Sequence, residues 1–311
     1  MDRIKSDENI DFSVASLIIR QLHSCVEGDA RLASLLLDHE VADKNYMVTH
    51  GLNVAWLVMG TATWMGLEAE QVRDTGMGAL FKDVGMLRVP DSVRMAARRL
   101  DDNERMLIEH HPIQTLDILE RCGGFSQTSL IVAYQAHECC NGTGYPRGRN
   151  RMTIHPMARL TAVADIYSAV TCNRPYRNGV TPYGGMTILL DEASAGRLDP
   201  NLVRIFLDCF TLFPIGSYVG LSDGTISRVL QSNGAEHTKP VVVPLDASGS
   251  ETDEEIDLST TDRLSVVEAL PTDDARRRAS QGGRDANDVS DDGRGQGEHE
   301  PDAIESAVDP G

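Results

Sequence analysis

The sequence predicts a mainly α-helical protein, in which a bundle of helices is followed by a small β appendage. From about residue 11 to residue 215, apolar residues recur at near-helical spacing and the connections are short. After Pro214 the pattern changes to short strand-like runs around turn residues. Hydrophobic residues make up 41% of the chain and aromatic residues 5%, so we expect an aliphatic core.

The expected helices fall into an N-terminal helical segment, residues 1–45, and a larger helical domain, residues 46–213. In the first, leucines at positions 17, 22, 32 and 35–37 carry the apolar spacing. Turns are expected at Pro90, at Gly123-Gly124 and at the stretch 141–144. The amphipathic segments of the larger domain are Tyr46–Met65, Glu68–Leu80, Asp91–Arg98, Asp102–His111, Ile113–Cys122, Ser129–Ala136, Met157–Cys172 and Tyr183–Ala195.

The β appendage is expected over residues 214–270. Two strands flank the Asp-Gly turn at 223–224, a third covers Lys239–Leu245, and Ile256–Ser259 could form a fourth. From Pro271 to residue 311 the chain has no aromatic and few apolar residues, so we predict a disordered acidic tail. A plain solvated tail and a regulatory tail both fit this composition, and the first is favoured.

Charge and composition limit the partners. A net charge of −18 argues against DNA and anionic membrane surfaces, although a small basic pocket for an anionic ligand is allowed. The start of the chain lacks the apolar run of a secretory signal, and no stretch is apolar enough to span a bilayer. The six cysteines form no Cys-x-x-Cys pair. These features favour a cytoplasmic protein.

A series of histidines and aspartates is the chemical signal in this chain. Scattered residues of this kind, converging from several helices, are typical of sites for divalent metals. Taken singly, each has a structural alternative: a satisfied core histidine, a helix cap, or a carboxylate paired with a neighbouring cation. Taken together, they favour a shared metal pocket. The candidate ligands are His50, Asp83, His111, His137 and Asp165.

Two further motifs lie near these residues. Gly144-Tyr145-Pro146 follows His137-Glu138 in a glycine-rich turn. Arg174 and Arg177 flank a rigid proline, a pattern that can grip phosphate oxygens through bidentate contacts. A surface loop with ordinary salt bridges is the alternative for the two arginines.

The order and spacing of these motifs resemble the HD-GYP family of the HD phosphohydrolase superfamily, over roughly residues 45 to 215. Bacterial members hydrolyse cyclic di-GMP. The resemblance implies an HD-type helical bundle with two or three metal ions, usually iron or manganese. It implies that the five candidate ligands hold metal, with Asp83 bridging two ions. It also implies that Tyr145, Arg174 and Arg177 contact the ligand.

The chain departs from the family pattern at several positions. Lys82 stands where the family has the histidine of the His-Asp pair, and Ala136 where it has the first of two adjacent histidines. Met86 replaces a lysine that holds phosphate in the family. Tyr46 replaces a glutamate of the third-metal site, and Asn141 replaces an aspartate. A lysine beside a divalent ion is repelled by about 8 kcal/mol at ~4 Å and an effective dielectric near 20.

These departures leave two structural alternatives. A weaker single-metal site could survive around Asp83, His111, His137 and Asp165. Alternatively, the Lys82 ammonium takes one metal's place by pairing with Asp83 and Asp165, and we favour this second picture.

The leading functional hypothesis is a degenerate HD-GYP protein, catalytically impaired, that acts in cyclic di-GMP signalling by binding a ligand or a partner. A diguanylate cyclase (GGDEF) domain is the candidate partner, and a homodimer is left open. The first alternative is an active metal-dependent phosphodiesterase with a reduced iron or manganese site, in which Asp83 or Asp165 orients water. A scaffold that binds neither metal nor nucleotide is the second.

Overall fold

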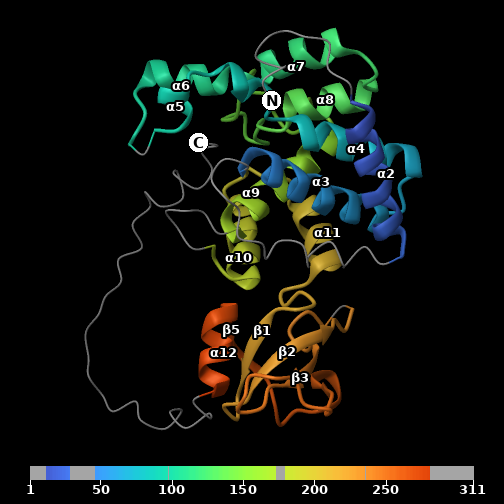
Figure 1. The fold of residues 1–311 in the computed structure, drawn as a ribbon, viewed down its shortest axis with the longest axis vertical. Coiled ribbons are helices and arrows are strands. Elements are labelled where there is room, and N and C mark those ends of the chain that lie inside the picture. The colour runs from blue at the N-terminus through green and yellow to red at the C-terminus, as the bar shows by residue number, and fades with distance from the viewer. Residues whose placement is uncertain (1–11, 29–45, 97, 173–178, 235, 281–311) are drawn as a thin grey trace.

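The computed structural model describes residues 12–28, 46–96, 98–172, 179–234 and 236–280. Helices form one part of the molecule, and a small sheet lies at its opposite end (Figure 1). The helices are α2 (Ser13–Gly28), α3 (Tyr46–Trp64), α4 (Ala69–Phe81), α5 (Asp91–Arg94), α6 (Asp102–Glu109), α7 (His111–Cys122), α8 (Gln127–Gln135), α9 (Pro156–Thr171), α10 (Pro182–Ser194) and α11 (Pro200–Phe210), with the 3-10 helix η3 (Val84–Arg88) after α4.

Helices α3 and α9 form the centre of the bundle. Nearly every residue of α3 from His50 to Ala62 is buried, and α9 is buried along most of its length. The core that they share with α4, α10 and α11 is mostly aliphatic, as expected, with Tyr167 and Phe206 as large fully buried rings. Helix α4 passes close to α8 at Gly78. A Cβ atom at this position would lie 2.6 Å from the carbonyl oxygen of Ser129.

The sheet is antiparallel, with the order β4-β3-β2-β1-β5. The Asp223-Gly224 turn joins β1 and β2, and Gly224 has a φ of 86°, which glycine adopts without strain. The strands are β1 (Tyr218–Leu221), β2 (Ile226–Gln231), β3 (Val241–Pro244), β4 (Ile256–Asp257) and β5 (Val266–Leu270).

The sheet contacts the bundle through α10 and α11. Tyr183 of α10 stacks on Phe213 with ring centroids 5.6 Å apart. His237, in the loop between β2 and β3, lies 3.3 Å from Asp208 of α11, measured between Nε2 and Oδ1. Phe213 also belongs to the apolar cluster that β1, β2 and β3 form. The segment that joins α11 to the sheet therefore packs against the sheet.

The predicted fold class is confirmed, and three elements correct the details. Helix α11 was not expected, nor was strand β5. The predicted disordered tail is wrong for its first residues, because α12 (Thr272–Ser280) packs on the sheet and buries Ala275 against Ile226 and Leu270. Residues 281–311, like 29–45 in the N-terminal segment, lie outside the described residues.

Two of the predicted elements are shorter than expected. Helix α5 ends at Arg94, and β4 ends at Asp257 before a 3-10 turn. No described helix combines the length and the apolar composition that a membrane crossing requires.

Candidate functional site

The centre of the candidate site is Lys82, at the end of α4. Its side chain is fully buried, and its ammonium group donates to a carboxylate oxygen of Asp83 and, at 2.8 Å, to Oδ1 of Asp165 on α9. Burial alone lowers the pKa of Lys82, but the attraction of the two carboxylates outweighs it and raises the pKa above its ordinary value. Lys82 is therefore a permanent cation between two acids.

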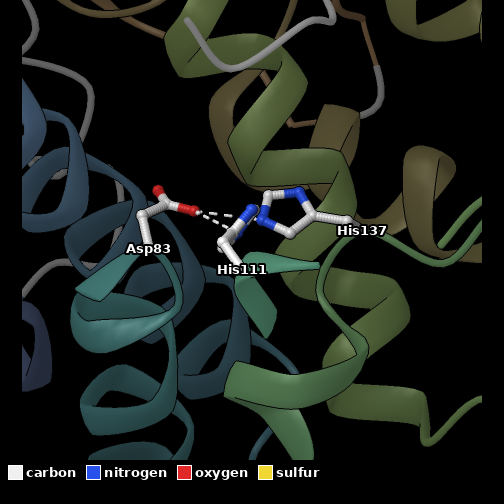
Figure 2. A group of neighbouring side chains, drawn as sticks. All are labelled: Asp83, His111 and His137. Carbon is white, nitrogen blue, oxygen red and sulfur yellow. Dashed lines mark hydrogen bonds and ion pairs between the residues drawn. The ribbon is translucent and has the colours of Figure 1, made fainter. Parts of the chain in front are cut away.

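Asp83 joins the lysine to two histidines. Its Oδ1 atom lies 3.0 Å from Nε2 of His137 and 3.4 Å from Nε2 of His111, and Figure 2 shows both imidazole rings directed at this carboxylate. Burial acts to raise the pKa of Asp83, yet the Lys82 ammonium and the hydrogen bond from His137 hold it well below its usual range. Asp83 is thus ionised and accepts contacts on both oxygens.

The two histidines reach Asp83 from different helix ends. His111 is the first residue of α7 and is fully buried, which lowers its pKa against the opposing attraction of Asp83. Its Nδ1–H donates to the carbonyl of Ile108 at 2.7 Å. His137 follows the end of α8. Short helices that meet at their ends therefore bring together residues distant in the sequence.

His50 and Asp165 form the other half of the cluster. His50 on α3 donates from Nε2 to Oδ1 of Asp165 at 2.7 Å, and the Ser168 hydroxyl donates to its Nδ1 at 3.2 Å. Burial acts to raise the pKa of Asp165, but Lys82 and His50 lower it below its ordinary value. The Asp165 side chain is 16% exposed, the most accessible of this cluster.

Two tyrosine rings flank the cluster. Tyr145 stacks on His137, with ring centroids 5.1 Å apart and planes inclined by 14°. Tyr46 stacks on His50 at 5.5 Å with an inclination of 6°. Both tyrosines are half-buried, so each ring covers one histidine and limits the access of water to it.

Glu138 fixes the loop that carries Tyr145. Its buried carboxylate accepts from the backbone N–H groups of Arg147 at 2.9 Å and Arg149 at 2.7 Å. The Tyr145 N–H donates to the carbonyl of His137 at 3.1 Å. A carboxylate that satisfies two backbone donors holds a loop firmly. Sequence reasoning gave Glu138 no separate role, although its place beside His137 is a usable signal.

Thr115 is a second residue that sequence reasoning missed. This fully buried side chain accepts from the Gly85 N–H at 2.9 Å and donates to the Lys82 carbonyl at 3.0 Å. It lies one turn after His111 on α7, so the two share a helix face. Thr115 therefore fixes the backbone on both sides of Asp83 relative to His111.

The structure brings together all five predicted ligands, but not in a form that fits two metal ions. Asp83, His111 and His137 offer donor atoms within 4.8 Å of one another, which fits one ion. The Nε2 atom of His111 is buried without a hydrogen-bond partner, as expected of a ligand atom. Lys82 pairs with the Oδ2 atom of Asp83 and with the Oδ1 atom of Asp165.

Two further departures, Met86 and Ala136, are buried in the structure. Met86 packs in an apolar cluster with Val89, Val93 and Ile108. Ala136 is buried at the end of α8 and offers no donor atom. Arg174 and Arg177, predicted to grip phosphate, lie outside the described residues.

Comparison with protein families matches residues 33–202 to the HD domain. The chain is 29% identical over 233 residues to cyclic di-GMP phosphodiesterase PA4108 of Pseudomonas aeruginosa, covering 75% of this chain and 56% of that protein. It is 34% identical over 157 residues to the cyclic di-GMP phosphodiesterase response regulator RpfG of Xanthomonas campestris, covering 50% of this chain and 40% of the relative. The chain thus spans about half the length of these curated relatives.

Among solved structures, the fold is similar to that of Bd1817, an HDG"Y"P protein from Bdellovibrio bacteriovorus. The TM-score is 0.50 at 22% identity, and the match covers 61% of each chain. This likeness concerns the fold. The family match covers more than half of the chain and includes Lys82 and all five predicted ligands. The resemblance drawn from the sequence is confirmed, and the chain belongs to the HD domain family.

Proposed function

We propose that this protein is a catalytically impaired relative of the cyclic di-GMP phosphodiesterases that acts in cyclic di-GMP signalling by binding the nucleotide or a partner. The observation that carries the proposal is the pairing of Lys82 with both Asp83 and Asp165. A pair of divalent ions stabilises the attacking and leaving oxygens of a phosphodiester and lowers the pKa of a bound water. An ammonium group in place of one ion supplies charge, but it cannot coordinate and activate water.

Three residues support the binding role. Tyr145 presents an aromatic ring on a loop that the Glu138 carboxylate fixes, and aromatic rings stack readily on nucleobases. Arg174 and Arg177 are proposed to hold the phosphates, since paired guanidinium groups suit that task. The same loop is the proposed contact for a GGDEF-domain partner.

The test combines binding and turnover on the full chain. Isothermal titration with cyclic di-GMP should show saturable binding, while chromatography of the mixture, incubated with Mn²⁺, should show no linear dinucleotide. Tyr145→Ala should weaken binding, whereas Met106→Ala, which alters an exposed side chain on α6, should not. Robust hydrolysis by the wild-type protein would refute the proposed impairment, and absence of binding would refute the nucleotide role.

The second candidate is an active phosphodiesterase with a reduced metal site. It is favoured by the convergence of Asp83, His111 and His137 and by the activity named for the relatives. In that case Asp83→Ala should abolish hydrolysis, because the carboxylate would be lost from the ion and from the water. An Asp83→Ala protein with unchanged turnover would exclude this mechanism.

A further inference from the structure

Three arginines meet around Cys140, in a chain whose net charge is −18. Arg151 and Arg159 both pair with the carboxylate of Asp199. The N–H of Cys140 donates to the carbonyl of Arg197 at 2.8 Å, and the carbonyl of Cys140 accepts from the N–H of Arg151 at 3.0 Å. Side-chain and backbone contacts therefore place these three arginines in one region of the surface.

Two more arginines, Arg147 and Arg149, lie in the same loop. Their backbone N–H groups donate to the carboxylate of Glu138, which precedes Cys140 by two positions. Among the described residues, no carboxylate forms an ion pair with either side chain. The Arg147 guanidinium donates to the hydroxyl of Tyr134 at 2.9 Å, and Nε of Arg149 is buried without a hydrogen-bond partner. These two positive charges therefore lack a direct counter-charge in the described chain.

The carboxylates that hold these arginines lie beneath them. Glu138, Glu192 and Asp199 are each between 1% and 2% exposed. The side chains of Arg151 and Arg197 are 43% and 38% exposed. An anion that approaches from solvent therefore meets guanidinium groups, which bind carboxylates through bidentate hydrogen bonds. We call the five residues the arginine cluster: Arg147, Arg149, Arg151, Arg159 and Arg197.

Met152 adds an apolar contact beside the arginine cluster. Its side chain is 90% exposed, the largest value among the large hydrophobic residues of the described chain. Its N–H donates to Oδ1 of Asn150 at 3.1 Å, so the turn that presents it is held in place. Arginine and methionine are enriched at protein interfaces. The surface therefore fits a peptide that combines several carboxylates with a few aliphatic side chains.

Residues 298–309 of this chain have that chemistry. They contain no lysine or arginine, and Ile304 and Val308 are their larger aliphatic side chains. Between them and Ser280, where α12 ends, lie 17 residues. A connection of this length spans at most about 60 Å, which exceeds the diameter of about 50 Å expected for a compact chain of this size. The five acids of the segment are Glu298, Glu300, Asp302, Glu305 and Asp309.

We propose that residues 298–309 dock on the arginine cluster of the same chain, beside Met152. Charge complementarity selects this occupant, and tethering favours it over a free acidic protein, because a segment joined to the same chain acts at an effective concentration of about 1 mM. The docked segment covers the loop proposed above as the contact for a GGDEF-domain partner, so it competes with such a partner. Docking requires neither metal nor nucleotide and is independent of the proposed function.

The experiment measures how fast phenylglyoxal modifies individual arginines of the full chain, by peptide mapping with mass spectrometry. Neutralising the segment should speed modification of Arg147 and Arg149 by about 3-fold, because a site with a Kd of about 0.5 mM is about two-thirds occupied at an effective concentration of about 1 mM. Arg20, exposed on α2, is the internal reference and should not change. The neutral variant combines Glu298→Gln, Glu300→Gln, Asp302→Asn, Glu305→Gln and Asp309→Asn.

A matched control removes acidic charge from the part of the chain nearer α12, and Arg147 and Arg149 should stay protected in it. An equal rise in both variants would show that overall charge, and not residues 298–309, protects the arginines, and would overturn the inference. Unchanged rates in the neutral variant would also overturn it. The control combines Asp285→Asn, Asp288→Asn, Asp291→Asn and Asp292→Asn.

Salt and protein concentration provide two further measurements on the wild-type chain. At about 1 M NaCl, where the Debye length is about 3 Å, the modification rates of Arg147 and Arg149 relative to Arg20 should rise to those of the neutral variant. Rates that do not respond to salt would contradict recognition by charge. Protection that grows with protein concentration would place the segment of a second chain on the arginine cluster and overturn the intramolecular assignment.

Discussion

Replacing Lys82 by methionine tests the central electrostatic argument. Methionine keeps most of the apolar stem and removes the ammonium group from between Asp83 and Asp165. At 2.8 Å the attraction of one such ion pair is about 6 kcal/mol at an effective dielectric near 20. Because desolvation of the lysine offsets part of this gain, and removal leaves two buried carboxylates, we expect the free energy of unfolding to fall by about 3–5 kcal/mol.

Urea denaturation in chelated buffer at pH 7 provides the assay. Lys239→Met is the control, because Lys239 pairs with Asp262 at 3.5 Å on the surface, where an ion pair contributes little. A free energy of unfolding for Lys82→Met within about 1 kcal/mol of the wild-type value would refute the reasoning, because breaking a buried ion pair should lower it by several times that amount.

The pH dependence gives an independent check. In the wild type, Lys82 holds the pKa values of Asp83 and Asp165 below their ordinary values. Such carboxylates stabilise the folded state above their unfolded pKa of about 3.9, and that stability is lost as the pH falls through their folded pKa. The stability gap between wild type and Lys82→Met should therefore narrow as the pH falls below about 4. A difference in the free energy of unfolding that stays constant as the pH is lowered would contradict the conclusion that Lys82 lowers the pKa values of Asp83 and Asp165.

The remaining predictions concern residues that support the cluster and one residue of the bundle core. Thr115→Val should lower the free energy of unfolding by about 1–3 kcal/mol because two buried backbone groups lose their partner, while Thr115→Ser should stay near the wild type in urea melts. Glu138→Ala should speed amide hydrogen exchange at Arg147 and Arg149, and unchanged protection there would show that the loop does not depend on this carboxylate. Phe206→Ala should cost about 3–5 kcal/mol in thermal or urea unfolding; a much smaller loss would mean that the bundle repacks around the gap.

The sequence predicted which residues meet in the cluster, although each member was ambiguous by itself and their role as metal ligands stays a prediction. His50, Asp83 and Asp165 lie in apolar helical segments, and polar groups in such segments need partners. In the structure these polar residues are partners of one another: His50 and Lys82 contact Asp165, and His137 contacts Asp83. The pairing of Lys82 with both aspartates was favoured because the resemblance places Lys82 at a ligand position, and the contacts of Lys82 agree with it.

The elements that were not predicted depend on contacts distant in sequence. Helix α12 is rich in charge and buries just Ala275 and Ala279, so its apolar spacing is too sparse to indicate a helix. Strand β5 buries only Leu270 completely and is defined by its pairing with β1. Helix α11 did carry signals, since Asp199 caps its first turn and Pro200 begins it.

The supporting residues of the site were not predicted for a similar reason. Thr115 and Ser168 are ordinary helix residues in the sequence, and their roles depend on the approach of α4 and α3 respectively. The helical repeat offered a partial signal, since Thr115 follows His111 by one turn and Ser168 follows Asp165 by three positions.

A positive charge that is covalently attached to the chain behaves differently from a dissociable ion. Chelators and metal starvation can remove a bound metal, but they cannot remove the ammonium group of Lys82, which is fully enclosed by the fold. The half of the cluster formed by His50 and Asp165 should therefore keep its shape whatever the metal supply of the cell. A protein built in this way can remain folded, and ready to meet its ligand, under conditions that strip a two-ion enzyme of its cofactor.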